Sequence, residues 1–219
     1  MGKKVGVILS GCGVYDGAEI HEAVITMLAL DRHGAEMVLC APDAPQLHVI
    51  NHLTGEVAEG EQRNVLVESA RIARGSIRDV AEVSADELDA LILPGGFGAA
   101  KNLCDFAVSG PDCSVHPEVA ELVRAVHDQG KAVAAICIAP ALIAKVLGTE
   151  GPELTIGTDA DTAGALETMG ARHVSCPVTE FVVDRDRKLI SSPAYMLAQS
   201  ISEAAEGIEK TVAALMEMA

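Results

Sequence analysis

The stretch Ala132-Val-Ala-Ala-Ile-Cys137-Ile-Ala-Pro-Ala-Leu-Ile143 passes from a continuous apolar run directly into a segment with helical character. Its first five residues are typical of a strand buried on both faces, as in a parallel sheet that helices cover on both sides. Pro140 suits the first turn of the helix, where a backbone N–H is not needed. Ala135 and Ala139 flank Cys137 in the small-x-nucleophile-x-small pattern of a nucleophile elbow. The stretch therefore predicts an α/β fold with Cys137 at the carboxyl end of the sheet.

The same succession of buried strand, loop and helix recurs along the chain. Apolar runs at residues 5–9, 37–41 and 90–93 predict strands, and residues 17–32 predict a helix. Further predicted elements are a strand at 154–156, a helix at 159–169, two strands around a charged turn at 181–190 and a final helix at 195–218. Residues 42–75 are interpreted as an insertion at the ligand end of the sheet. The pattern predicts one doubly wound domain over residues 1–219, with a mostly parallel sheet and helices on both faces.

Composition and charge exclude several classes of protein. The 219 residues are 49% hydrophobic, which is enough to build a core without disulfides or metals. A formal charge of −16 repels nucleic acid and anionic membrane surfaces, so neither is expected as a partner. Because the sequence has no bilayer-spanning run and no signal-peptide pattern, a cytoplasmic location is expected. There the six cysteines are expected to stay reduced, and none forms a C-x-x-C pair.

Two interpretations of Cys137 stay open from spacing alone. A thiol beside a helix N-terminus has a lowered pKa, which favours a nucleophilic thiolate. Free cysteine is also among the residues most often buried as part of a core. The loop Leu91-Ile-Leu-Pro-Gly95-Gly96-Phe-Gly-Ala-Ala-Lys-Asn102 favours the nucleophile. The backbone N–H of Gly95 or Gly96, with that of Ile138, can form an oxyanion hole beside the sulfur, although two glycines also suit an ordinary tight turn.

The first glycine-rich loop, Gly11-Cys-Gly-Val-Tyr-Asp-Gly17, does not predict a dinucleotide site. Its spacing is one residue longer than G-x-G-x-x-G, and Asp16, Glu19 and Glu22 place negative charge where a pyrophosphate would bind. Asp16 also suits a helix cap, and Glu19 suits the first turn. Glu22 lies among apolar residues, where an unpartnered carboxylate is costly. It therefore faces either solvent or a site that uses it, and the helical wheel does not decide which.

Longer motifs carry a resemblance to a known family. They begin at Gly6 (GVILSGCGVYDGAEIHE), Val49 (VINHLTGE), Pro94 (PGGFGAAKN), Cys137 (CIAP), Thr155 (TIGTD) and Pro193 (PAYMLAQ). Together they resemble the ElbB family of the class I glutamine amidotransferase-like superfamily, a glyoxalase-like group linked to isoprenoid biosynthesis. The resemblance implies a flavodoxin-like core with Cys137 as the reactive cysteine and Glu22 as the acid, with Glu19 in reserve. The only His-x-Glu pair, His116-Pro-Glu118, precedes the cysteine, which argues against glutaminase activity.

The function implied is a cofactor-independent glyoxalase that converts a small 2-oxoaldehyde, such as glyoxal or methylglyoxal, to the 2-hydroxy acid. Cys137 would add to the aldehyde and Glu22 would move the proton between the substrate carbons. The residues expected to bind the substrate and its oxyanion are Gly95, Gly96, Ile138, Glu19, Cys12 and His52. No metal, glutathione or nucleotide is required by this scheme.

Two other functions remain as alternatives. The first is a redox sensor or regulator in which Cys137 is oxidised instead of turning over a substrate. The second is a metal-dependent hydrolase that uses His21, His52 and Cys12. Independently of function, the first helix is too apolar to be exposed, so we expect part of it to be buried in a homodimer.

Overall fold

A seven-stranded sheet lies at the centre of the computed structural model, which describes residues 2–219. The strands are β1 (Lys4–Ile8), β2 (Glu36–Ala41), β3 (Ile50–Asn51), β4 (Glu56–Val57), β5 (Arg78–Asp79), β6 (Ala90–Leu93), β7 (Ala132–Ile136), β8 (Glu153–Leu154), β9 (Arg172–His173), β10 (Val182–Asp184) and β11 (Leu189–Ser192). Their order in the central sheet is β10-β11-β7-β6-β1-β2-β5, parallel except between β10 and β11. The inner order β2-β1-β6-β7-β11 is that of flavodoxin-like sheets, so the predicted fold class is confirmed.

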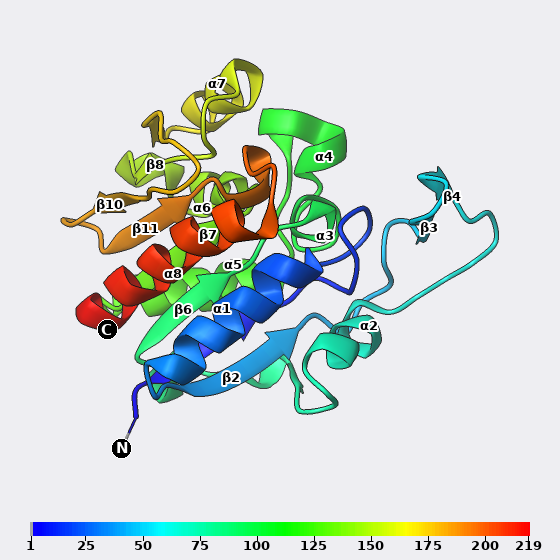
Figure 1. The fold of residues 1–219 in the computed structure, drawn as a ribbon, viewed down its shortest axis with the longest axis horizontal. Helices are drawn as coiled ribbons and strands as arrows, with labels where there is room; N and C mark the ends of the chain where they lie inside the picture. The colour runs from blue at the N-terminus through cyan, green and yellow to red at the C-terminus, as the bar shows by residue number, and fades with distance from the viewer. Residues whose placement is uncertain (1) are drawn as a thin grey trace.

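Helices cover both faces of this sheet (Figure 1). The α-helices are α1 (Ile20–Arg32), α2 (Val65–Ile72), α3 (Phe97–Lys101), α4 (Phe106–Ser109), α5 (Pro117–Asp128), α6 (Pro140–Leu147), α7 (Ala160–Thr168) and α8 (Ile201–Met218). Helices α1 and α8 pack into the hydrophobic cluster on one face, and α5 and α6 pack into the cluster on the other. Strand β6 supplies Leu91 and Leu93 to the α5 side and Ala90 and Ile92 to the α1 side. Burial on both faces explains why the strand sequences are continuously apolar.

Most predicted elements are present, with corrected ends. The strands at 90–93 and 132–136 match β6 and β7, and the pair at 181–190 matches β10 and β11. The final helix begins at Ile201 instead of residue 195, because the Ser200 side chain caps it by accepting from the Glu203 N–H. The strand at 154–156 is only Glu153–Leu154, and it pairs with β9 outside the central sheet. The single domain over residues 1–219 stays a prediction, which a sheet drawn from both halves of the chain supports.

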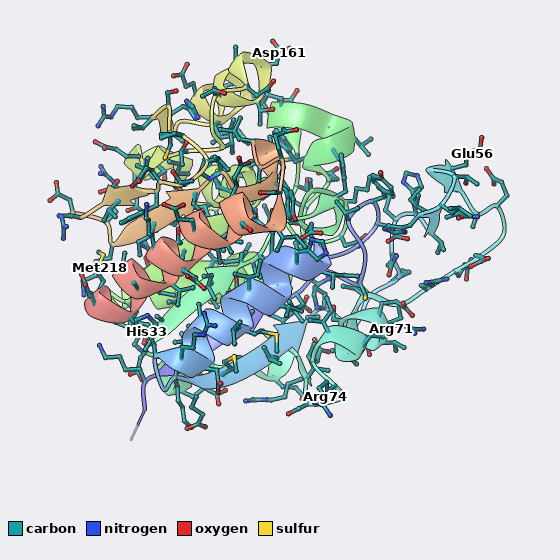
Figure 2. All side chains as sticks on the ribbon, viewed as in Figure 1. His33, Glu56, Arg71, Arg74, Asp161 and Met218 are labelled. Atoms are coloured by element: carbon teal, nitrogen blue, oxygen red, sulfur yellow. The ribbon has the colours of Figure 1, made fainter. Side chains whose placement is uncertain are left out.

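The predicted insertion after β2 forms an arm and a helix. Strands β3 and β4 pair as a short antiparallel ladder, and α2 follows them. Figure 2 shows Glu56 on the arm, well away from the body of the molecule, and Arg71 on α2. The segment lies on the carboxyl-end side of β2, as expected.

Helices α1 and α8 lie side by side across one face of the sheet, and they run in the same direction (Figure 1). His33, just after α1, and Met218, at the end of α8, both lie on the left of the view, opposite the arm that carries Glu56 (Figure 2). None of the helices within residues 2–219 is both long and apolar enough to cross a bilayer.

Candidate active site

Cys137 occupies a strained turn at the carboxyl end of β7. Its φ of 62° lies in the left-handed region, which a residue with a side chain enters at a cost of about 1–3 kcal/mol. The Cys137 N–H is held by the carbonyl of Ser192 at the end of β11, at 2.9 Å. Pro140 then begins α6, as its place in the sequence predicted. The strand, the turn and the helix form the expected elbow.

Glu22 reaches this turn from α1, and it is completely buried. Its Oε2 accepts the Gly95 N–H at 2.9 Å, and its Oε1 accepts the Tyr195 N–H at 3.1 Å. The thiol of Cys137 lies close enough to this carboxyl for the two groups to shift each other's pKa. Of the two placements that the helical wheel allowed, Glu22 therefore takes the one that faces the cysteine.

The approach between these groups depends on Gly95, which lies between them. A Cβ on Gly95 would stand 2.4 Å from the Cys137 Cβ and 2.7 Å from Glu22 Oε2. Gly96 has a φ of 96°, and a Cβ there would stand 2.3 Å from the Glu19 backbone nitrogen. The two glycines therefore do more than form a turn, because no other residue lets β6 end so close to the elbow.

Burial sets the protonation of the pair. Removal from water raises the pKa of Glu22 to about 7, and the negative charge of Glu19 acts in the same direction. Burial also raises the pKa of the Cys137 thiol well above its usual range, and the charge of Glu22 adds to this effect. The expectation that the helix N-terminus lowers the pKa of Cys137 is wrong, because desolvation outweighs it. The pair therefore holds a thiol beside a carboxyl that titrates near neutral pH.

The backbone N–H groups that were predicted to form an oxyanion hole have two different partners. The N–H groups of Gly96 and Ile138 lie close enough to the sulfur of Cys137 to lower its pKa in part. The N–H of Gly95 is donated to Glu22 instead. Gly95 therefore does not serve as the expected oxyanion donor in this arrangement, and Gly96 and Ile138 are the pair that faces the sulfur.

Glu19 has a different place from Glu22. Its Oε2 caps α1 by accepting the Glu22 N–H at 2.7 Å, and its own N–H is donated to the Gly95 carbonyl at 2.9 Å. Asp16 is not the cap that the sequence allowed, because its Oδ2 accepts the Ile50 N–H at 2.7 Å. Glu19 lines the pocket above Cys137, whereas Glu22 lies beneath it.

A pocket of about 430 Å³ opens above the sulfur. It is lined by Val14, Glu19, Gly96, Phe97, Ala100, Phe106, Ala107, Cys137, Ile138, Thr162, Tyr195 and Met196. Sequence reasoning missed the contributions of α4, of Thr162 from α7 and of the turn at Tyr195. Tyr195 belongs to the motif that begins at Pro193, to which the sequence assigned no role. Ala194 has a φ of 41°, and this turn precedes the Tyr195 N–H that is donated to Glu22.

The structure does not bring Cys12, His52 or His21 onto this lining. His52 lies on the arm, where its Nε2 accepts the Tyr15 N–H at 3.2 Å and its ring stacks on Tyr15. Burial raises the pKa of Cys12, which lies near the charges of Glu68 and Arg71. His21 instead bonds the Tyr195 hydroxyl through Nδ1 at 2.9 Å. Across residues 2–219 no cluster of three or more His, Cys, Asp or Glu side chains is arranged to hold a metal ion, so these three do not form the hypothesised ligand set.

Comparison with known proteins places this site in a family. Residues 12–200 match the model of the DJ-1/PfpI family. The chain belongs to the DJ-1/PfpI family. A human relative, named glutamine amidotransferase-like class 1 domain-containing protein 3, mitochondrial, is 48% identical over 98% of this chain and 83% of its own length. This name agrees with the superfamily that the sequence motifs indicated.

Two solved structures resemble the chain at different levels. An isoprenoid biosynthesis protein with an amidotransferase-like domain from Ehrlichia chaffeensis is 37% identical, with a TM-score of 0.90 over 98% of this chain and 99% of its own. Glyoxalase III from Candida albicans is 15% identical, with a TM-score of 0.62 over 97% of each chain. At that identity the second likeness concerns the fold alone.

The relatives correct the expected location. The human protein and its counterparts from Rattus norvegicus and Danio rerio are all named mitochondrial. The prediction of a cytoplasmic location is therefore wrong. It rested on the absence of a signal-peptide pattern, and such an absence does not identify a compartment.

Proposed function

We propose that this DJ-1/PfpI family member is a cofactor-independent glyoxalase with Cys137 as nucleophile and Glu22 as acid and base. One observation carries the proposal: a buried carboxyl with a pKa of about 7 lies beside a cysteine that lines an open pocket. A general base works best when its pKa lies near the operating pH. The Candida albicans neighbour named glyoxalase III adds a fold-level analogy.

The first step is addition of the thiol to the aldehyde. The sulfur forms a bond to the aldehyde carbon as Glu22 takes the thiol proton, and the carbonyl electron pair moves onto oxygen. The Gly96 and Ile138 N–H groups, which lie near the sulfur, would hold this oxyanion. Glu22 then gives this proton to the oxyanion, which completes a hemithioacetal and returns Glu22 to the carboxylate. Because the resting thiol is protonated, the reaction depends on a base that is in place before the substrate arrives.

The remaining steps move one proton and add one water. Glu22 takes the proton from the hemithioacetal carbon to give an enediol, and it returns a proton to the neighbouring carbon. The product of this isomerisation is a 2-hydroxy thioester of Cys137. Water then cleaves the C–S bond, which releases the 2-hydroxy acid and restores the thiol. One carbon is oxidised and its neighbour is reduced, so no external oxidant or reductant is consumed.

The backbone contacts of Glu22 fit this role. Each of its oxygens accepts one N–H, from Gly95 and from Tyr195. These contacts orient the carboxyl and partly offset the effect of burial on its pKa. The carboxyl is thereby held near neutrality, where it can both accept and return a proton.

The finer assignment within the family is also a proposal. We infer that the chain is a member of the ElbB group, supported by the Ehrlichia chaffeensis protein at 37% identity. A link to isoprenoid biosynthesis rests on the name of that protein alone.

The test is loss of methylglyoxal with chiral detection of lactate, using protein treated with a chelator. We expect no turnover with Cys137→Ala and a loss of about 100-fold or more with Glu22→Gln. Glu19→Gln reports on the reserve acid, and Cys176→Ala is the matched control, since Cys176 is also buried but lies outside the pocket. Absence of lactate from the wild type contradicts the proposal.

The redox alternative has a distinguishable outcome. Peroxide attacks the thiolate, and burial raises the pKa of Cys137, so the resting state disfavours oxidation. Conversion of Cys137 to sulfinic acid under mild peroxide, without turnover of any dicarbonyl, would favour the sensor instead.

A further inference from the structure

The pocket is larger than the substrates considered so far. Its volume of about 430 Å³ lies within the range of roughly 300–1,000 Å³ that is typical of sites for drug-sized ligands. Glyoxal and methylglyoxal have four and five non-hydrogen atoms, and either would leave most of this space to water. The structure therefore offers a second ligand-binding region above the groups that carry out the chemistry.

The walls of this region are apolar. Two neighbouring short helices supply most of them, with Phe97 and Ala100 from α3 and Phe106 and Ala107 from α4. Met196 and Val14 close further sides. The two phenyl rings and the small residues of this lining suit a flat apolar group, because aromatic rings gain from stacked or edge-to-face contact. Burial of such a group would contribute binding free energy that a two- or three-carbon aldehyde does not supply.

The charges of the pocket disfavour an anionic substrate. Within the described residues, the side chains that line it include no Lys, Arg or His, and the only ionisable ones are Glu19, Cys137 and Tyr195. Lys101 lies nearby, but its Nζ is donated to the Tyr15 carbonyl at 2.9 Å and stands 5.1 Å from the centre of the Phe97 ring. A carboxylate, phosphate or glutathione conjugate would meet Glu19 without a Lys or Arg side chain on the lining to offset it.

We propose that the pocket takes a neutral carbonyl compound with an apolar body about the size of a phenyl ring, in preference to glyoxal or methylglyoxal. The inference deepens the proposed function, since it names the substrate class for the Cys137 and Glu22 pair. The carbonyl carbon lies against Cys137, and the apolar body lies between the walls from α3 and α4. Aryl and branched-alkyl 2-oxoaldehydes have this form.

Two variants on α4 test the proposal. Ala107 lines the pocket and is exposed, so Ala107→Phe narrows the pocket without burying a new side chain in the core. The next residue, Val108, is 68% exposed and does not line the pocket, so Val108→Phe is the matched control. Thermal unfolding of both variants verifies that each is folded.

The first readout does not depend on turnover. Cys137 is alkylated with 2-chloroacetamide and with N-benzyl-2-chloroacetamide; the sulfur bonds to the methylene carbon, chloride leaves, and the thiol proton passes to solvent. The alkylation rate of the protein with each probe is divided by the rate of the same probe with free cysteine. The alkylated residue is identified from the masses of proteolytic peptides. We expect the benzyl probe to be favoured about tenfold in the wild type, an effect that Ala107→Phe removes and Val108→Phe retains. Equal normalised rates for the two probes, or equal effects of the two variants, would overturn the proposal.

The second readout is the ratio of kcat/KM for phenylglyoxal, followed as mandelate, to that for methylglyoxal, followed as lactate. We expect this ratio to be about ten or more in the wild type and to fall in Ala107→Phe. Selective labelling without turnover of either aldehyde would refute the glyoxalase and keep the pocket assignment. Turnover of methylglyoxal with no selectivity in either readout would keep the glyoxalase and refute the pocket assignment.

Discussion

The buried carboxyl of Glu22 and the thiol of Cys137 lie close enough to shift each other's pKa, and a Cβ on Gly95 would clash with both residues. Two ionisable groups in one dry site cannot both be charged at low cost. The pair therefore keeps at least one proton near neutral pH. This shared proton links the stability of the protein to the chemistry of the site, because the group that destabilises the fold when ionised is also the proposed base.

Glu22 should make stability fall as pH rises. Its pKa is raised from 4.5 to about 7 in the folded protein, so between these values the folded state binds more protons than the unfolded state. Its stabilising contribution is full below pH 4.5 and is lost as pH rises through 7. The whole effect is at most about 3 kcal/mol, from roughly 1.4 kcal/mol per pKa unit.

The measurement is denaturant unfolding of the wild type and Glu22→Gln between pH 5 and pH 8. The amide of the variant meets a backbone N–H from Gly95 or Tyr195, which costs a constant amount at every pH. The pH dependence that comes from Glu22 is therefore the change with pH in the difference between the free energies of unfolding of the two proteins. We expect the wild type to lose stability relative to the variant as pH rises, and a constant difference would show that Glu22 titrates normally.

Gly95→Ala should separate the pair. The new Cβ would stand well inside contact distance of both Cys137 and Glu22, so one of them must move. We expect a loss of about 100-fold in kcat/KM, since a displacement near 1 Å is enough for this, with a cost of about 1–3 kcal/mol in stability. Gly164→Ala is the control, because a Cβ at that helical position meets nothing within 4 Å. Full activity in Gly95→Ala would mean that the close approach is not needed.

Local sequence was sufficient to predict the elements that depend on local properties. The continuous apolar runs at 90–93 and 132–136 identified β6 and β7, because strands buried on both faces need no alternation. The small residues Ala135 and Ala139 around Cys137 predicted the elbow, because they are also a local property of the sequence. The start of the final helix was wrong although Ser200 and Glu203 formed a cap signal, since the apolar residues before them extended the apparent pattern.

The site beyond the elbow depends on contacts that no single segment contains. Whether Glu22 faced solvent or sulfur was set by its contacts with Gly95 and Tyr195, which lie far from it in the sequence. The pKa of Cys137 was predicted in the wrong direction because burial, a tertiary property, outweighs the helix N-terminus. Phe106 and Thr162 reach the pocket only through the path of the chain between strands, so residue type and spacing could not identify them.

Cys12 and His52 should be dispensable for catalysis. Both were expected to bind the substrate, and neither lines the pocket above Cys137. We therefore expect Cys12→Ser and His52→Ala to keep kcat/KM within about threefold of the wild type, as for substitutions remote from a site. Activity of each variant on methylglyoxal and phenylglyoxal is the measurement. A loss of 100-fold in either would contradict the prediction, and with His52→Ala it would mean that the arm closes over the pocket during turnover.

The exposed face of α1 should hold two copies of the chain together. Ile20, Val24 and Leu28 lie four residues apart on one side of the helix and are 43%, 48% and 43% exposed. Such a stripe of large apolar side chains is typical of an interface, and the symmetric use of one surface by both partners gives a closed dimer.

We expect a homodimer at micromolar concentration by light scattering. Val24→Glu should give a monomer, because a charge at the centre of an apolar interface is buried without a partner. Leu53→Glu, at a position that is 93% exposed on the arm, is the control and should stay dimeric. A monomeric wild type would contradict the prediction of a homodimer. A dimer that survives Val24→Glu would place its interface away from this helix.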